Sequence, residues 1–366
     1  MAEIHVEHLQ KAFGDFVAVR DSTFTVRDGE FFCLLGPSGC GKTTTLRMIA
    51  GLELPSSGRI LLGGEDVAFK RASHRDIAFV FQLFALYPHM NVRTNIAYPL
   101  RSQGMSRHDV QTRVEEAARI LRIQHLLDRR VSGLSSGDRQ RVALGRAIVR
   151  EPLAFLLDEP LGALDAEFRD VMCGELRALH DRLRATTVYV THDQLEAMAM
   201  ADTIALMNHG VVEQLGTPQD IYDRPVSLFV ADFIGSPPMS FLSFRGQVAP
   251  GDRTVRLGSV DIALPEVREG RADAELVLGV RPEHIELSDH APLRAEVLDA
   301  EYLGTTQIVT LSTVTGARVK ARIPADIPVR PGERTGLKFR PGQLSLFDKA
   351  SGRALRTALH DGGAHG

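Results

Sequence analysis

Residues 31 to 43 of this chain read Phe31-Phe32-Cys33-Leu34-Leu35-Gly36-Pro37-Ser38-Gly39-Cys40-Gly41-Lys42-Thr43. The first part is an apolar run, and Gly36 to Thr43 fits the phosphate-binding pattern G-x-x-x-x-G-K-[ST]. A helical pattern over Thr43 to Gly51 follows directly. Between a strand and a helix, the backbone N–H groups of such a loop and the positive end of the helix dipole converge on phosphate groups. The sequence therefore predicts a nucleotide-binding α/β domain.

Individual roles follow from this loop. Lys42 is expected to hold the β- and γ-phosphate oxygens, and the Thr43 hydroxyl to be a Mg²⁺ ligand. Cys40 lies close to Lys42 and the expected helix start, which would favour its thiolate, so that thiol reagents inactivate the protein and MgATP protects it; an unreactive packed thiol is the alternative. The predicted nucleotide-binding residues of the loop are Gly36, Ser38, Gly39, Cys40, Gly41, Lys42, Thr43 and Thr44.

A second apolar run, Leu153 to Leu157, ends in the acidic pair Asp158 and Glu159. A carboxylate at the end of a buried strand can hold Mg²⁺ directly or through water, and Asp158 fits that role. Glu159 can polarise a water molecule for attack on the γ-phosphate. An isolated acidic pair after a strand is more typical of a helix start, but its combination with a phosphate loop favours the metal site.

Composition limits the class of protein. The chain has 366 residues with 43 Lys plus Arg and 46 Asp plus Glu, a net charge of -3, which argues against nucleic acid as a partner. Its 44% hydrophobic and 24% charged residues are typical of a globular protein. No apolar run reaches the ~18 residues of a transmembrane helix. The first residues lack a signal-peptide pattern, and the three cysteines are interpreted as cytosolic thiols.

Successive regions of the chain differ in their patterns of apolar, proline and glycine residues. Up to about residue 235, short apolar runs such as Ile77 to Phe81 and Thr187 to Val190 alternate with helical patterns, which favours a parallel sheet covered by helices. Residues 83 to 150 are interpreted as a helical insertion, with a helix starting after Ser106. Ser236-Pro237-Pro238 is typical of a linker. Residues 236 to 354 predict a small all-β domain of barrel type, and residues 355 to 366 a disordered tail.

Leu134-Ser135-Ser136-Gly137-Asp138 resembles the signature segment of ATP-binding cassette (ABC) ATPases. The order of phosphate loop, Gln82, signature, acidic pair and His192 is also that of the family, over residues 1 to about 235. Gly279 to His284 and Ile234 to Met239 resemble the β-barrel extension and linker of ATPase subunits from maltose-type and glycerol-3-phosphate-type importers. The resemblance implies an α/β P-loop ABC ATPase domain with a helical subdomain at about 83–150, followed by a C-terminal all-β, OB-like domain of TOBE type.

The resemblance also implies further site residues. Phe13 matches the aromatic residue that stacks on adenine, and Gln82 the glutamine that touches Mg²⁺ and the attacking water and responds to the membrane partner. His192 matches the histidine that bonds the γ-phosphate and orients water. The implied catalytic set is therefore Glu159, His192 and Gln82, and the implied metal set is Thr43, Gln82 and Asp158.

A second subunit is part of the implied site. Ser135 and Gly137 are expected to contact the γ-phosphate bound to the opposite subunit, and Asp165 belongs to a loop that crosses the dimer interface. The family signature usually reads L-S-G-G-Q, so Ser136 and Asp138 are departures. They are consistent either with a tolerated variant in a homodimer or with a heterodimer in which a related ATPase carries the stronger signature.

By resemblance, the expected function is that of the ATP-hydrolysing subunit of an ABC importer for a carbohydrate, polyol or glycerol-phosphate-type solute. The implied partners are the second ATPase subunit, two transmembrane permease subunits and, indirectly, a periplasmic solute-binding protein. The surface near Gln82, including residues 83–90, is expected to receive the permease at the cytoplasmic face of the cell inner membrane. The β-barrel domain is expected to be a regulatory or dimerisation domain that thickens the dimer interface, binds a regulator or senses a metabolite, and a structural role is the alternative.

Three alternatives remain at this point. The transported solute could be a polyamine, thiosulfate or ferric ion, because related ATPases carry similar β-barrel extensions and the ATPase does not touch its solute. A soluble ABC protein of DNA repair or translation is disfavoured by the single phosphate loop and the lack of sustained heptads. A purely regulatory nucleotide sensor would bind ATP without turnover.

Overall fold

The computed structural model describes residues 2–82, 84–162, 164 and 166–361. The chain forms two compact units, Met1–Pro218 and Gln219–Gly366. The helices α7 (Pro218–Asp223) and α8 (Leu228–Phe233) precede the proline-rich linker at which the sequence places the boundary. Because Leu228 and Ala231 pack against Val277 and Phe347 of the β-rich unit, the compact division falls earlier in the chain than residue 235.

The first unit is built on a 10-stranded sheet in the order β5-β4-β1-β2-β10-β9-β3-β8-β7-β6. Its core strands β3, β6, β7, β8 and β9 run parallel, as the continuous apolar runs predict. The antiparallel arm of β1, β2 and β4 was not predicted. The strand bounds are β1 (Ile4–Phe13), β2 (Phe16–Val26), β3 (Phe31–Leu35), β4 (Ser57–Leu62), β5 (Glu65–Asp66), β6 (Ile77–Val80), β7 (Ala154–Asp158), β8 (Thr186–Thr191), β9 (Thr203–Asn208) and β10 (Val211–Gly216).

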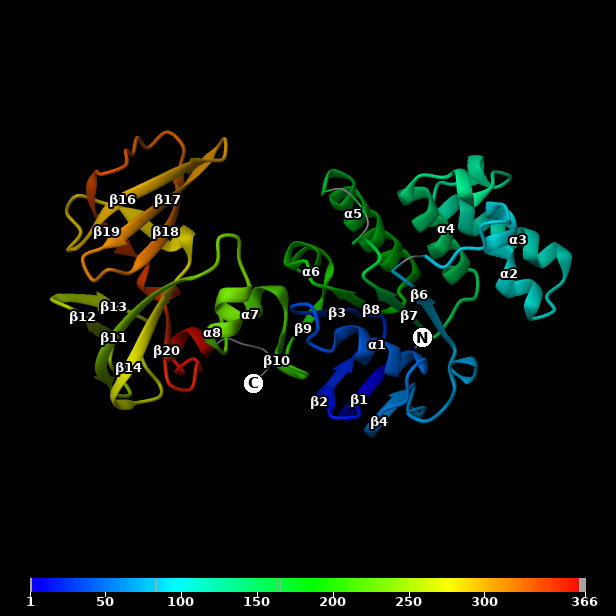
Figure 1. The fold of residues 1–366 in the computed structure, drawn as a ribbon, viewed down its shortest axis with the longest axis horizontal. Helices are drawn as coiled ribbons and strands as arrows, with labels where there is room; N and C mark the ends of the chain where they lie inside the picture. The colour runs from blue at the N-terminus through cyan, green and yellow to red at the C-terminus, as the bar shows by residue number, and fades with distance from the viewer. Residues whose placement is uncertain (1, 83, 163, 165, 362–366) are drawn as a thin grey trace. The chain divides into compact units, whose positions relative to one another are not determined.

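Helices cover both faces of the parallel strands. Figure 1 shows α1 (Lys42–Ala50) on one side of β3 and β8, with α5 (Ala166–Leu183) and α6 (Gln194–Met200) on the other. The alternation of side chains along β3 explains this arrangement: Phe32 and Leu34 share a core with the α1 residue Leu46, whereas Phe31 contacts His180 of α5. A strand buried on both faces holds its carboxyl end in a fixed place, which a binding site at that end requires.

A group of helices is inserted between β6 and β7. It consists of α2 (Val92–Ser102), α3 (Arg107–Ile120) and α4 (Ser136–Ile148), which pack against one another beside the sheet (Figure 1). Ser106 caps α3 by accepting the N–H of Asp109, at the position where the sequence predicted the helix start.

The second unit is mostly β, with the short helices α7 and α8 and several 3-10 turns beside its strands. Its strands form sheets of three (β11-β14-β20), two (β12-β13) and five (β15-β19-β16-β17-β18) members around one apolar core. Alternating burial along β18 is typical of a sheet with one face in the core. The strand bounds are β11 (Ser240–Val248), β12 (Thr254–Leu257), β13 (Val260–Ala263), β14 (Arg271–Val280), β15 (Ile285–Leu287), β16 (Leu293–Tyr302), β17 (Thr306–Thr313), β18 (Arg318–Pro324), β19 (Arg334–Phe339) and β20 (Ser345–Asp348).

The expectation of a disordered tail from residue 355 onward is corrected for residues 355–361. Leu355 is buried in the core of the β-domain, and its N–H donates to the Leu346 carbonyl at 2.7 Å. Thr357 is fully buried and caps a 3-10 helix over Ala358–His360. The buried Leu355 side chain and the Thr357 cap order this segment, and neither produces a periodic pattern in the sequence. Residues 362–366 lie outside the described residues.

A buried arginine completes the end of α1. The Arg75 side chain is 2% exposed, and its Nη1 donates to the carbonyls of Met48 and Ile49 in the last turn of the helix, at 2.6 and 2.7 Å. Its Nη2 donates to the Ala68 carbonyl at 2.9 Å. Burial lowers the pKa of Arg75 to about 10. One guanidinium therefore satisfies helix-end carbonyls that would otherwise lack partners.

Replacing Arg75 with Ala is expected to lower the free energy of unfolding of the first unit by about 2–4 kcal/mol, because several buried carbonyls lose their donor. Urea unfolding followed by circular dichroism measures this change. Arg71→Ala, at an exposed position close by in the chain, is the matched control and should change stability by less than about 0.5 kcal/mol. Equal, small effects of both variants would contradict the role given to Arg75.

Candidate active site

Four adjacent parallel strands end at one edge of the sheet, and a predicted site residue follows each of them. The strands stand in the order β3-β8-β7-β6. The phosphate loop follows β3 and His192 follows β8, while Asp158 is the last residue of β7 and Gln82 lies two residues after β6. Since the carboxyl ends of parallel strands share an edge, residues far apart in sequence are brought together there.

The phosphate loop is held against two neighbouring strands. A Cβ atom on Gly36 would lie 2.2 Å from the Met207 carbonyl oxygen of β9, and one on Gly41 2.6 Å from the Ala18 carbonyl oxygen of β2. Gly41 has φ 107° and precedes α1 without a side-chain cap. Only glycine fits these positions, and the first-turn N–H groups of α1 have no capping side chain to compete with a phosphate.

Lys42 is held over the loop that precedes it. Its side chain is 4% exposed, and the ammonium donates to the carbonyls of Gly36 at 2.8 Å and Pro37 at 2.9 Å. A buried ammonium among backbone carbonyls can exchange these partners for phosphate oxygens, to which it is bound more strongly because they are charged.

Thr43 and Asp158 meet at the base of the site. The Thr43 hydroxyl donates to Asp158 Oδ1 at 2.9 Å. Asp158 is 4% exposed, and burial raises the pKa of this carboxyl, opposed in part by the bond from Thr43. A desolvated carboxylate beside a hydroxyl is a pair of hard oxygen ligands that suits Mg²⁺.

Within the described ranges of the chain there is no group of three or more His, Cys, Asp or Glu side chains placed to hold a metal ion. Mg²⁺ commonly binds through one or two protein ligands together with waters and substrate phosphates. The residues therefore fit Mg²⁺ that arrives with a nucleotide.

Two of the predicted catalytic residues, Gln82 and His192, lie close to one carboxylate oxygen of the third, Glu159. Glu159 Oε2 lies 3.3 Å from Gln82 Nε2 and 3.4 Å from His192 Nδ1. Glu159 has φ 45°, and its N–H donates to the Val190 carbonyl of β8 at 3.0 Å. Its side chain is 20% exposed and that of His192 54%. The carboxylate is thus oriented by two polar groups and still open to a water molecule. The metal-ligand role of Gln82 stays a prediction.

Phe13 lies at the tip of the β1–β2 hairpin. It is 47% exposed, and the ammonium of Lys11 stands 4.6 Å from the centre of its ring. The neighbouring strand β2 passes the phosphate loop at Ala18, only two residues beyond the start of that strand. An exposed ring at this end of the sheet suits stacking on a base, which stays a prediction.

The signature segment lies in the inserted helical group. Its helix, α4, begins at Ser136. Ser135 caps the helix: its Oγ accepts the N–H of Asp138 at 3.2 Å and donates to Asp138 Oδ2 at 2.8 Å. Among the described residues, no hydrogen bond or ion pair joins Ser135 or Gly137 to the cluster at the sheet edge. Asp165 of the expected interface loop lies outside the described residues, as do Leu83 and Ala163.

The expected thiolate at Cys40 is corrected by the structure. Cys40 is 4% exposed, and burial raises the pKa of its thiol even though Lys42 Nζ lies 3.8 Å from the sulfur. Desolvation of the thiolate outweighs the attraction of the ammonium. The alternative of a packed, unreactive thiol describes this residue better.

Sequence analysis missed a buried group of hydrogen-bonded side chains around Glu196, which lies four residues after His192 in the chain. Glu196 of α6 is 4% exposed and accepts hydrogen bonds from the hydroxyls of Tyr189 and Thr191, both at 2.7 Å. Asp193 with Glu196 three positions later matches a helix-start pattern, which could have located α6. Nothing in that pattern signals that Glu196 is buried.

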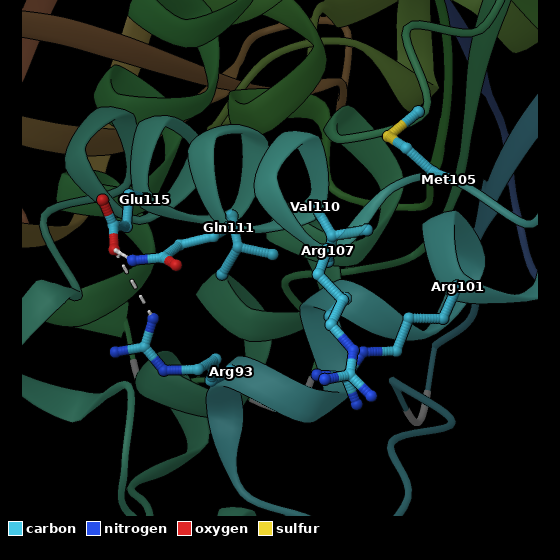
Figure 2. Close-up of a pocket in the computed structure, with 9 residues that line it drawn as sticks. Arg93, Arg101, Met105, Arg107, Val110, Gln111 and Glu115 are labelled. Carbon is cyan, nitrogen blue, oxygen red and sulfur yellow. Dashed lines mark hydrogen bonds and ion pairs between the residues drawn. The ribbon is translucent and has the colours of Figure 1, made fainter.

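Two cavities border helix α2. One of about 250 Å³ is lined by Tyr87, Tyr98 and Arg146, among others. The other, of about 720 Å³, lies between α2 and α3, and Figure 2 shows Arg101 and Arg107 among the residues that line it. Neither cavity includes a predicted site residue.

Among the described residues, no helix combines the length and the apolar character that a membrane-spanning helix needs.

Comparison with known sequence families gives three matches. The family described as ABC transporter matches residues 19–162. The MalK OB fold domain matches residues 235–285, and the TOBE domain matches residues 278–347. The matches cover both compact units.

Relatives align along almost the entire chain. The trehalose import ATP-binding protein SugC of Mycobacterium tuberculosis is 46% identical over 390 residues, covering 97% of this chain and 98% of its own. The trehalose/maltose import ATP-binding protein MalK of Thermococcus litoralis is 45% identical, covering 97% and 100%. The sn-glycerol-3-phosphate import ATP-binding protein UgpC of Cereibacter sphaeroides is 45% identical, with the same coverage.

Solved structures resemble part of the chain. CbiO1 from Clostridium perfringens, part of the ABC transporter complex cbiONQ, superposes with a TM-score of 0.56 at 28% identity, covering 60% of this chain and 89% of that one. A dimeric ATP-binding cassette in a post-hydrolysis state, bound to ADP and Pi, gives a TM-score of 0.52 at 27% identity, covering 59% and 98%.

Asp158→Asn is expected to stabilise the nucleotide-free protein at neutral pH. The folded state raises the pKa of Asp158, so folding disfavours the ionised carboxylate. The resulting loss of folding stability is absent below the ordinary pKa of the carboxyl and develops as the pH rises through the raised value. Asparagine keeps the acceptor for Thr43 without the charge. The Tm should rise by about 2–4 °C, for ~1 kcal/mol, while Mg²⁺-dependent nucleotide binding weakens.

Thermal unfolding at several pH values measures the effect, and the gain in Tm should shrink as the pH falls toward 4. Asp15→Asn, at an exposed position, is the control and should leave Tm unchanged. A Tm below that of the wild type at neutral pH would contradict the desolvation of Asp158.

Cys40 is expected to resist thiol reagents in the native, nucleotide-free protein, since both burial and the raised thiol pKa oppose attack. Titration with a chromogenic disulfide should label all three cysteines rapidly only after denaturation, because each is buried. Rapid native labelling of Cys40, blocked by MgATP, would restore the original expectation.

Proposed function

This chain belongs to the ATP-binding proteins of ABC importers, and on that basis we propose that it hydrolyses ATP to drive uptake of a carbohydrate- or glycerol-phosphate-type solute through separate permease subunits. The observation that carries the hydrolytic part is the convergence of Gln82 and His192 on Glu159 beside the pair of Thr43 and Asp158. The solute class is supported by the relatives, whose names specify trehalose, maltose and glycerol-3-phosphate and whose similarity extends through the β-domain.

The chain's own groups perform the separate tasks of hydrolysis. The loop amides and Lys42 bind the phosphates, with the ammonium exchanging its carbonyl partners for phosphate oxygens. Thr43 and Asp158 hold Mg²⁺, which when bound neutralises charge that develops on the phosphoryl oxygens. The Glu159 carboxylate accepts a hydrogen bond from the attacking water and then its proton, and Gln82 and His192 fix the direction in which it points.

A second ATPase subunit completes the site. Ser135 and Gly137 stand at the start of α4 in the helical group rather than at the strand ends, so a signature segment that reaches the γ-phosphate must come from another chain. The dimeric cassette with a similar fold supports this arrangement. We favour a homodimer, because Asp138 serves as a partner for the Ser135 hydroxyl and its presence does not disrupt the helix start.

The membrane subunits would dock beside Tyr87. The cavity of about 250 Å³ at Tyr87, Tyr98 and Arg146 adjoins residues 84–90, which follow Gln82 in the chain. Arg146 donates to the carbonyls of Phe84 and Ala85, so pressure on this segment would be transmitted to the helical group. On this proposal the ATPase would lie at the cytoplasmic face of the membrane. The β-domain has its own core and is assigned a structural role.

Glu159→Gln is expected to reduce steady-state ATP hydrolysis by about 100-fold or more, since the amide cannot accept the proton of water. Nucleotide binding should persist, and an ATP-bound dimer should accumulate in gel filtration. Phosphate release assays on the purified chain with MgATP measure the rate, and Glu167→Gln, at an exposed position, is the control. Unaltered turnover in Glu159→Gln, or wild-type protein that binds ATP without turnover, would contradict the proposal.

A further inference from the structure

One side chain contacts both loops that flank the hydrolytic residues. Arg169 lies in the first turn of α5, and its Nη2 donates to the Leu164 carbonyl at 3.1 Å. Its Nη1 donates to Asp193 Oδ2 at 2.9 Å. Leu164 belongs to the loop after Glu159, and Asp193 directly follows His192. Arg169 therefore connects the expected interface loop to the loop that carries the histidine.

The residues on both sides of His192 belong to the same network. The Thr191 hydroxyl donates to Glu196 Oε2 at 2.7 Å and accepts the N–H of Asp193 at 3.0 Å. Asp193 Oδ1 caps α6 by accepting the N–H of Leu195 at 2.8 Å. The His192 backbone is thus fixed at each neighbour, while its imidazole reaches Glu159.

The network depends on the positive charge of Arg169. Its Nε lies 3.6 Å from Glu196 Oε1, and Glu196 is 4% exposed. Burial raises the pKa of Glu196, so its ionised form requires the nearby guanidinium and the two hydroxyls. Removal of the half-buried guanidinium leaves the buried Glu196 carboxylate without its charged partner and frees the groups that Arg169 ordered.

We propose that Arg169 is a positioning residue for hydrolysis: it holds the His192 loop in register with the loop ending at Leu164, so that contacts made by a second subunit on that loop are relayed to the γ-phosphate histidine. The proposal rests on the proposed function, because it assumes ATP turnover in a dimer. Among the described contacts Arg169 does not touch Glu159, and it acts through Asp193 and Glu196.

Arg177 is a matched control on the same helix. It donates to the Met200 carbonyl and to Asp202, both at 2.8 Å, and pairs with Asp181 at 3.0 Å. It therefore ties α5 to the far end of α6 through the same kind of contact, without touching the loop at Leu164 or the loop at Asp193. A general loss of α5 packing should appear in both Arg169→Ala and Arg177→Ala, whereas a loss of loop positioning should appear only in Arg169→Ala.

The test measures kcat and KM for ATP hydrolysis by the full chain with Mg²⁺. Arg169→Ala is expected to lower kcat by about 10-fold with KM within about twofold, the pattern of a lost transition-state interaction. Arg169→Lys should recover part of kcat, because an ammonium can pair with one carboxylate but cannot span three partners. Arg177→Ala should keep both constants within about twofold of the wild type. ATP binding by Arg169→Ala, measured by calorimetry, shows that the variant is folded.

A double-mutant comparison separates positioning from packing. If Arg169 acts through the histidine loop, adding Arg169→Ala to His192→Ala should lower kcat no further. Multiplicative losses, or an Arg169→Ala kcat equal to that of Arg177→Ala, overturn the inference while leaving the proposed function intact. A wild-type chain without turnover overturns the proposed function and the inference with it.

Discussion

The alignment of four parallel strand ends is the constraint on which the site depends. Lys42, Asp158, Glu159, His192 and Gln82 are spread over more than a hundred residues of sequence, and only the order β3-β8-β7-β6 makes them neighbours. Because these strands are buried on both faces, their ends cannot shift without disturbing the core. The contacts of Thr43 with Asp158 and of Glu159 with Gln82 and His192 follow from that alignment.

The same constraint supports our proposal that one chain is insufficient. The strand ends hold the residues proposed to bind phosphate, ligate the metal and accept a proton, but the Ser135 cap is located on an inserted helix. A site assembled from two surfaces is complete only when they approach, which converts nucleotide binding into movement of one subunit relative to another. Arg169 fits this account, since it connects a loop expected at the interface with the His192 loop.

Sequence analysis predicted the local elements well, and it selected residues that the structure brings together at the strand ends, because both carry periodic or motif signals. The apolar runs at Phe31 and Ala154, the loop at Gly36 and the Ser106 cap are all encoded by neighbouring residues. The buried charges of Arg75 and Glu196 and the half-buried charge of Arg169 were not predicted, because they are indistinguishable from surface charges until their tertiary partners are known. For the same reason the prediction of a thiolate at Cys40 was wrong. The sequence shows that Cys40 lies close to Lys42, but it does not show that burial desolvates the sulfur. The roles of Phe13, Ser135 and Gly137 toward a nucleotide stay predictions.

The central claim is that the phosphate loop of one chain and the signature segment of another form each hydrolytic site. Mixing two inactive variants tests it most directly: Lys42→Ala keeps an intact signature, and Gly137→Asp keeps an intact phosphate loop. In the mixture, one site of each mixed dimer combines the two intact halves. The account predicts that the ATP hydrolysis rate of the mixture exceeds the mean of the two separate rates. A mixture at that mean, or full activity of Gly137→Asp alone, would contradict it.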